Sequence, residues 1–150
     1  MNIAPRSDAG FLLKQVQHAG LYTVDEDASR IVFNAAASLG FNAYRINLRL
    51  ATDAKKLMHI FERALHFPDW FGANWDALAD CLCDMSWQEA DGYVLVLQRL
   101  ENLEQKEPET ITMLFDILRE TTKSWCEQNI PFWILAEGYA GALPRLRIPT

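Results

Sequence analysis

Two short runs of apolar residues do most to limit what this chain can fold into. These runs are Tyr93 to Leu97 and Phe132 to Leu135. Every residue in them is aliphatic or aromatic, and Tyr93 alone carries a hydroxyl group. Continuous runs of this length are typical of strands that are covered on both faces, as in a parallel sheet. Between them, after a polar loop containing Pro108, a helix is expected from about 109 to 127. Its inward residues are predicted to be Met113, Leu114, Ile117, Leu118, Thr121 and Trp125.

The rest of the chain repeats this alternation of strands and helices. Residues 1–20 look loosely ordered, with room for one short helix within 11–20. Two further strands are expected, at 21–24 and 41–48. The helix between them is predicted from an apolar stripe of Ala28, Ile31, Val32, Ala35, Ala36 and Leu39. Two more helices should follow the second strand: one is capped by Thr52 or Asp53 and stopped by Pro68, and the other is capped by Asn74, with Leu78, Cys81, Leu82 and Met85 inward. Strands that alternate with helices imply right-handed crossovers and an α/β fold.

Composition places the chain among ordinary globular proteins and removes several functional classes. Its 150 residues suit a single domain, half of them are hydrophobic, and no apolar run approaches the ~18 residues of a membrane span. The N-terminus lacks the features of a signal peptide, so a cytoplasmic protein is expected. Three cysteines without regular spacing predict reduced thiols, and the histidines lack metal-ligand spacing, so no metal or cofactor is expected.

Charge is distributed unevenly along the chain. Residues 1–63 carry a net charge of +2, whereas residues 64–150 carry −8. Between Arg63 and Arg99 there is no Lys or Arg, although six acidic residues fall inside that window. Such a field repels RNA and anionic membranes and attracts a basic surface, so the predicted partner is a basic protein rather than nucleic acid or a membrane.

Three of these acids, Asp76, Asp80 and Asp84, are four residues apart on the helix predicted after Asn74, and together they are called the acidic face below. Like charges at this spacing repel, typically by a few tenths of a kcal/mol per pair. Asp76 gains from the helix dipole, but Asp80 lies beyond the first turn and has no cation near it in sequence. Trp70 and Trp75 flank these carboxylates, as aromatic residues do at binding hot spots. Carboxylates on a rigid helix can replace nucleic-acid phosphates, so a basic, phosphate-binding protein is the predicted partner.

The run FPDWFGANWDALADCL, the strand at 93–97, a helix containing Leu118-Arg119-Glu120 and a strand at 132–136 together resemble the barstar family of ribonuclease inhibitors, over about residues 43–136. The resemblance implies a small, three- to four-stranded parallel sheet packed by helices, in a cytoplasmic protein that covers the active site of a ribonuclease and is not an enzyme. It makes Asp80 the central carboxylate, Asp76 a second acidic contact, Trp70 an aromatic that packs on the enzyme, and Glu120 a peripheral charge. The partner-binding residues expected from this reading are Trp70, Gly72, Asn74, Trp75, Asp76, Ala77, Ala79, Asp80, Cys83, Asp84 and Glu120.

The sequence also departs from the family pattern. Ala79 and Met85 stand where the reference inhibitor has aromatic residues, with Trp87 displaced by two positions, and both changes are expected to remove interface area. This leaves a second hypothesis, a module that docks on another basic protein without inhibiting RNA cleavage. A third is an enzyme that uses Asp76 and Asp80 as an acid/base pair.

The N-terminal extension, residues 1–42, has no counterpart in the small members of the family. Its strand and helix pattern predicts an extra βα unit, either as a fourth strand of the sheet or as a segment that covers an edge or mediates self-association. Residues 43–136 would form the core of the domain and residues 137–150 a tail.

Overall fold

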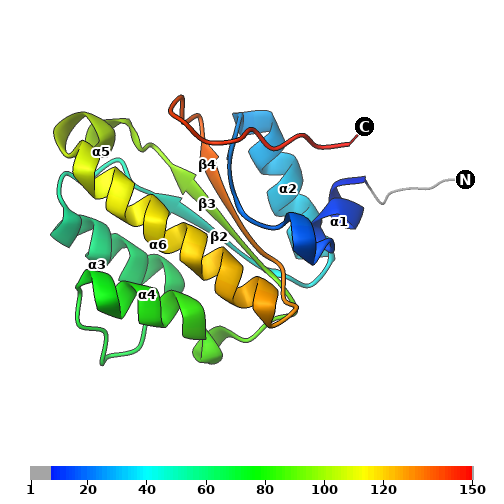
Figure 1. Ribbon diagram of the computed structural model, residues 1–150, viewed down its shortest axis with the longest axis horizontal. Coiled ribbons are helices and arrows are strands. Elements are labelled where there is room, and N and C mark those ends of the chain that lie inside the picture. The colour runs from blue at the N-terminus through cyan, green and yellow to red at the C-terminus, as the bar shows by residue number, and fades with distance from the viewer. Residues whose placement is uncertain (1–7, 150) are drawn as a thin grey trace, which may run out of the picture.

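Within residues 8–149, which the computed structural model describes, four parallel strands form one sheet (Figure 1). The strands are β1 (Leu21–Val24), β2 (Asn42–Asn47), β3 (Tyr93–Gln98) and β4 (Phe132–Glu137), and their order is β1-β4-β3-β2. The two most apolar strands, β3 and β4, occupy the centre, with Leu95 opposite Ile134. The predicted α/β fold with a parallel sheet is confirmed.

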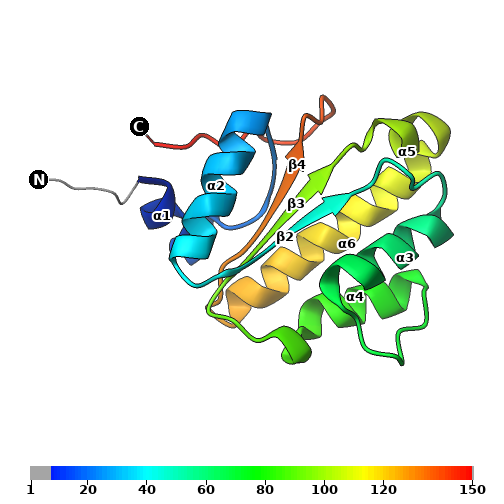
Figure 2. The same cartoon turned by 180° about the vertical axis from the view of Figure 1, so that it is seen from behind.

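Helices cover both faces of the sheet, and the strand order explains which helix lies where. The chain crosses from β1 to β2 in one direction and steps back from β2 through β3 to β4 in the other. Right-handed crossovers then place the first connection on one face and the later ones on the opposite face. Figures 1 and 2 show this arrangement, with α1 (Asp8–Leu13) and α2 (Glu26–Ser38) on one side and α3 (Ala54–Leu65), α4 (Trp75–Asp84) and α6 (Pro108–Glu127) on the other.

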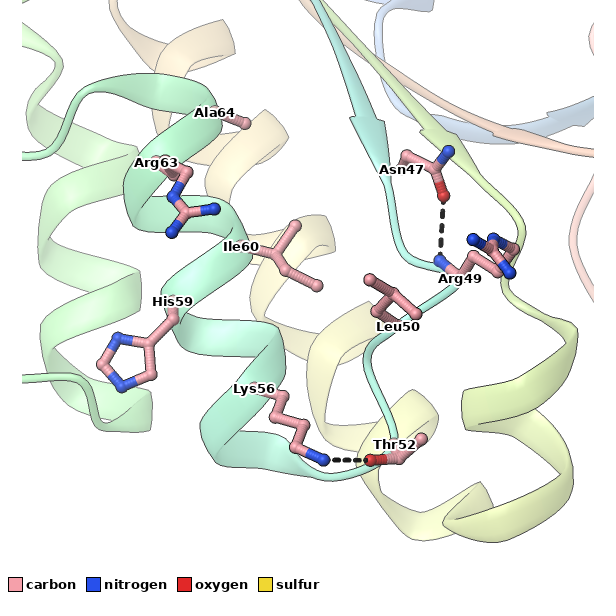
Figure 3. Close-up of a pocket in the computed structure, with 9 residues that line it drawn as sticks. All are labelled: Asn47, Arg49, Leu50, Thr52, Lys56, His59, Ile60, Arg63 and Ala64. Carbon is pink, nitrogen blue, oxygen red and sulfur yellow. Dashed lines mark hydrogen bonds between the residues drawn. The ribbon is translucent and has the colours of Figure 1, made fainter.

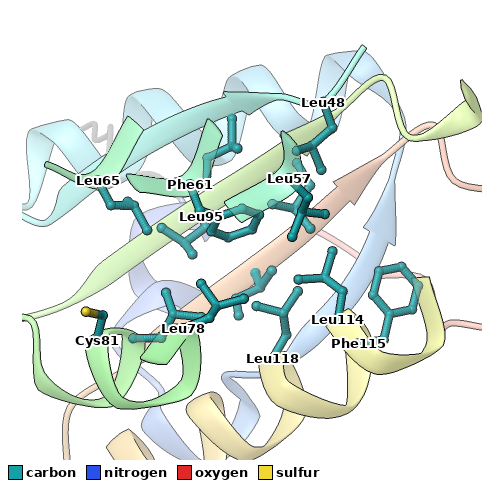
Figure 4. Close-up of a cluster of buried hydrophobic side chains, with 14 of the residues drawn as sticks. Leu48, Leu57, Phe61, Leu65, Leu78, Cys81, Leu95, Leu114, Phe115 and Leu118 are labelled. Carbon is teal, nitrogen blue, oxygen red and sulfur yellow. The ribbon is translucent and has the colours of Figure 1, made fainter. Parts of the chain in front are cut away.

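Each face of the sheet has its own hydrophobic core. The larger core lies under α3, α4 and α6 and includes Phe61, Leu78, Leu95 and Leu118 (Figure 4). The smaller core lies under α2 and contains side chains that point to the other face of β3 and β4, such as Val94. Alternate residues of a central strand therefore enter different cores, which is why these strands are apolar throughout.

The N-terminal unit adds a fourth strand to the sheet, as one of the two alternatives predicted. β1 pairs with β4, with Leu21 opposite Ile134. A short helix precedes β1, and the indole N–H of Trp133 donates a hydrogen bond of 3.0 Å to the carbonyl of Leu13 at its end. The segment before β1 is therefore fixed to the sheet together with β1 itself.

The C-terminal tail lies along the outer edge of β1. The backbone N–H of Thr23 donates to the carbonyl of Pro144 at 2.8 Å, and the N–H of Leu146 donates to the carbonyl of Thr23 at 3.1 Å. Leu146 is buried in the smaller core. The tail thus satisfies backbone groups that an edge strand would otherwise expose.

Three sequence predictions about single elements were wrong. Met113, predicted inward, is 43 % exposed, because the buried positions of α6 run along a stripe at 110, 111, 114, 115, 118, 121, 122 and 125 that leaves it outside. Ile31 is 46 % exposed on α2 for a similar reason. The polar loop before Pro108 contains a further helix, α5 (Glu101–Lys106), anchored by the buried side chain of Leu103.

The predicted helix starts agree with the structure. Asp53, rather than Thr52, caps α3 and accepts a hydrogen bond of 2.9 Å from the N–H of Lys56. The same helix ends at Leu65, three residues before Pro68, because His66 adopts a left-handed conformation with φ 56°. The chain therefore turns away from α3 earlier than the proline alone would predict.

Candidate protein-binding face

Helix α4 is held rigidly by a cap, a buried face and a neighbouring helix. Asn74 caps it, accepting a hydrogen bond of 2.8 Å from the backbone N–H of Ala77. Leu78, Cys81 and Leu82 are fully buried, and the indole N–H of Trp125 on α6 donates to the carbonyl of Leu82 at 2.8 Å. A helix fixed in this way presents its other side with little freedom to move.

That other side carries the acidic face. Asp76, Asp80 and Asp84 are all exposed. The five ion pairs found among residues 8–149 involve other carboxylates, and no hydrogen bond within that range reaches these three side chains. The structure therefore contains three solvated carboxylates on one helix, in the part of the molecule it describes, without a compensating charge.

The small residues of α4 border the acidic face. Ala77, Ala79 and Cys83 are partly buried. Because their side chains are small, they project less from α4 than the exposed aspartates do. Trp75, expected at the partner surface, is also partly buried and packs against the larger core. Its ring contributes to the support of α4 as well as to the surface.

The thiol of Cys81 lies beneath the acidic face. Burial raises the pKa of Cys81 to about 11, and the negative charges of Asp84, Asp80 and Glu62 act in the same direction. A buried thiol with a raised pKa is protonated at neutral pH and unreactive. Cys81 is thus a packing residue, whereas Cys126 is exposed.

The loop before α4, residues 66–74, places one tryptophan outside and two phenylalanines inside. Phe67 and Phe71 are buried, with ring centroids 4.8 Å apart. The N–H of Phe71 donates to the carbonyl of Pro68 at 3.0 Å and closes a turn. Trp70 lies within this turn and is 62 % exposed, an unusual position for so large an apolar side chain.

Trp87 supports Trp70, a role that the sequence did not reveal. Its ring meets that of Trp70 edge to face at 6.4 Å and that of Phe67 at 5.8 Å. Its indole N–H donates to the carbonyl of Leu65 at 3.1 Å. The residue lies in a 3-10 turn after α4, where no periodicity links it to the 66–74 loop, so only its aromatic character pointed to it.

The remaining predicted residues are distributed around α4. Gly72 is exposed, and a Cβ at this position would lie 3.3 Å from the side-chain nitrogen of Asn74. A larger residue here would therefore crowd the side chain that caps α4. Glu120 is exposed on α6, the helix against which α4 packs. Met85 is fully buried in the larger core, so its side chain adds no area to the exposed surface around α4. That the lack of aromatic residues at 79 and 85 reduces interface area stays a prediction.

Two other features are absent from the part of the chain that the structure describes. Among the described residues, no three His, Cys, Asp or Glu side chains gather closely enough to hold a metal ion. No helix within that part of the chain is both long and apolar enough to cross a membrane.

Sequence comparison adds an independent finding. No curated protein matches the chain. A family model described as Barstar (barnase inhibitor) matches residues 41–137, close to the range expected from the sequence pattern and more than half of the chain. The chain therefore belongs to the barstar family.

Proposed function

We propose that this protein inhibits a ribonuclease by covering the enzyme's active site with α4 and the 66–74 loop. The observation that carries the proposal is the acidic face, three exposed carboxylates on a rigid helix without counter-charges among the described residues. Membership of a family described as barnase inhibitors supports the same reading.

The physical basis is the likeness between a row of carboxylates and a phosphate backbone. A ribonuclease must bind its anionic substrate with cationic side chains, and these cations are available to any other anion of suitable spacing. Asp80 lies in the middle of α4, beyond the end that gains from the helix dipole, so the charge it carries is best compensated by a partner. A desolvated carboxylate of this kind can contribute several kcal/mol to a complex.

The other residues have supporting roles in this proposal. Asp76 supplies a second carboxylate one turn earlier, and Trp70 supplies apolar area at the edge of the interface. Gly72, Asn74, Trp75 and Ala77 shape the surface between them, and Glu120 adds a peripheral charge. Ala79, Cys83 and Asp84 complete the contact region on α4.

A second candidate function keeps the surface and changes its partner. Ala79 gives α4 a small side chain beside the aspartates, which favours a flatter and less apolar contact than an aromatic residue would make. The protein would then dock on a basic protein that does not cleave RNA.

The experiment compares three forms of the purified chain as baits for host and secreted proteins. They are the native chain, Asp80→Asn, and Glu104→Gln as a control that neutralises an exposed acid on α5. Each captured protein is then assayed for RNA cleavage with and without the bait.

The proposal expects the native chain and Glu104→Gln to capture a ribonuclease and to suppress its activity, and Asp80→Asn to do neither. Capture of a basic protein without ribonuclease activity, lost in Asp80→Asn, would replace inhibition by docking. Equal capture and inhibition by all three forms would show that the acidic face is not the binding surface.

A further inference from the structure

A second surface, of opposite charge, lies between α3 and the segment that follows β2. It is a groove of about 850 Å³ lined by nine residues (Figure 3). Arg49, Lys56 and Arg63 supply its charge, and Leu50, Ile60 and Ala64 supply its apolar surface. These six residues define what is called the basic groove below.

The cations of the basic groove have no acidic partner in the part of the chain that the structure describes. The ion pairs found there involve Arg30, His59, Arg99, Arg119 and Arg145. The side-chain amine of Lys56 donates a hydrogen bond of 3.1 Å to the hydroxyl of Thr52. His59, which also lines the groove, lies 3.3 Å from the carboxylate of Glu62.

This concentration of positive charge runs against the composition of the chain. The protein has 20 acidic residues and 14 basic ones, yet the lining of the groove contains no Asp or Glu. Cations that line one groove repel one another, so an anion bound between them would stabilise the arrangement.

The floor of the groove is apolar and accessible. Leu50 is 67 % exposed, and in Figure 3 its side chain points toward that of Ile60 on α3. Exposed leucines that lie singly are common on protein surfaces, but here the leucine lines a concave surface together with two other apolar residues. A ligand that fits must present an apolar group as well as negative charge.

We propose that the basic groove binds an acidic, amphipathic peptide segment of a partner protein. An apolar side chain of the segment would pack on Leu50, Ile60 and Ala64, and flanking carboxylates would pair with Arg49, Lys56 and Arg63. Arginine is well suited to this role because its guanidinium group can bind a carboxylate through two parallel hydrogen bonds.

Nucleic acid is the other polyanion that a basic surface could take, and the structure disfavours it. No Phe, Tyr or Trp lines the groove to provide a large ring for stacking against a base. Residues 64–150 carry a net charge of −8, which repels an extended polyanion that continues beyond the groove. A short peptide segment avoids that repulsion.

This proposal does not depend on ribonuclease inhibition. The residues of the basic groove belong to α3 and to the segment after β2, whereas the acidic face belongs to α4. One protein could therefore hold a basic partner on α4 and an acidic segment on α3.

The test measures binding of a fluorescein-labelled synthetic peptide of alternating Glu and Leu, by fluorescence anisotropy, to four forms of the full chain. Lys56→Glu removes a groove cation, and Leu50→Ser removes exposed apolar surface. Lys55→Glu is the matched control, because Lys55 is exposed on the same helix but does not line the groove. A single-stranded RNA oligomer with the same label is the competing probe, and thermal melting verifies that each form folds.

The expected result is that the native chain and Lys55→Glu bind the peptide alike. Lys56→Glu should raise the Kd about tenfold and Leu50→Ser about fivefold, while the RNA oligomer binds more weakly than the peptide. The proposal is overturned by an absence of peptide binding, by an equal loss in Lys55→Glu and Lys56→Glu, or by preference for the RNA oligomer.

Discussion

Asp80 stands four residues from both Asp76 and Asp84 on α4, so three negative charges follow one side of a helix of ten residues. Among the residues it describes, the structure shows no contact through which Asp80 would stabilise the free protein. Its carboxylate is exposed and forms no hydrogen bond within residues 8–149. Repulsion between neighbouring aspartates works against the helix. Under the proposed function, folding and binding make opposite demands on this one side chain.

Asp80→Asn is therefore expected to make the free protein slightly more stable. Neutralising the middle charge removes two like-charge pairs, and each contributes about 0.2 to 0.5 kcal/mol of repulsion. Urea denaturation should show a small increase in the free energy of unfolding. A clear decrease would mean that Asp80 stabilises the fold, and its charge would then need no partner.

The thiol of Cys81 makes the free energy of unfolding depend on pH in the alkaline range. Its folded pKa of about 11 lies above the ordinary value of 9.0, so the folded state holds the proton more tightly than the unfolded chain. This stability is fully present below pH 9 and is lost as the pH rises toward 11. The loss is roughly 2 kcal/mol over that interval.

The measurement is urea denaturation of the native chain and of Cys81→Ala at several pH values across this range. Cys81→Ala is less stable at every pH because it leaves a cavity, but its stability should fall less steeply with pH. Parallel slopes for the two forms would show that the thiol is not responsible. Tyrosines with raised pKa values titrate in both forms, so they do not affect the comparison.

At the scale of elements, α4 and the 66–74 loop form one rigid unit that carries the acidic face and Trp70. The Asn74 cap fixes the helix start, the turn at Pro68 fixes Trp70, and Trp87 packs beneath the loop. Each contact acts on backbone or rings and leaves the exposed carboxylates untouched. The unit is therefore ordered before any partner arrives, which lowers the entropy lost on binding.

Asn74→Ala tests the cap. Loss of the bond to the N–H of Ala77 should reduce the free energy of unfolding by about 1 kcal/mol. Asn34→Ala, at an exposed position inside α2, is the control and should cost nothing, since alanine is a better helix former than asparagine. Equal stability of Asn74→Ala and the native chain in urea would contradict the role assigned to the cap.

At the scale of the whole molecule, the sheet has one protected edge and one open edge. Residues 144–146 hydrogen bond to β1, whereas β2 ends the sheet on the other side. Charged and polar residues on β2, such as Arg45 and Asn47, are exposed and discourage pairing with another chain. The tail is thus part of the fold and not an appendage.

Truncation after Leu143 is expected to expose the edge of β1 and part of the smaller core, because Leu146 is removed. The truncated chain should be less stable in urea and should self-associate with increasing concentration, as size-exclusion chromatography with light scattering would show. A shortened chain that remains monomeric and as stable as the native one would show that the tail does not protect β1.

Local patterns in the sequence were sufficient to predict the strands, the helix starts and the exposure of the acidic residues on α4. The apolar runs of β3 and β4 and the caps Asp53 and Asn74 follow from rules that involve only neighbouring residues. The route of the tail along β1 could not be predicted, because it depends on hydrogen bonds between residues more than a hundred positions apart. The support of Trp70 by Trp87 and the basic groove were missed for a different reason, because each joins side chains from different elements that no single periodic pattern links.

The inhibition constant for a captured ribonuclease, measured with the native chain, Asp80→Asn and Glu104→Gln in one RNA-cleavage assay, tests the central claim most directly. The account predicts that Asp80→Asn inhibits at least about a hundredfold more weakly, in line with the loss of several kcal/mol from a buried charge pair, while Glu104→Gln stays within about twofold of the native chain. Inhibition by Asp80→Asn as strong as that by the native chain would contradict the claim that the acidic face covers the active site.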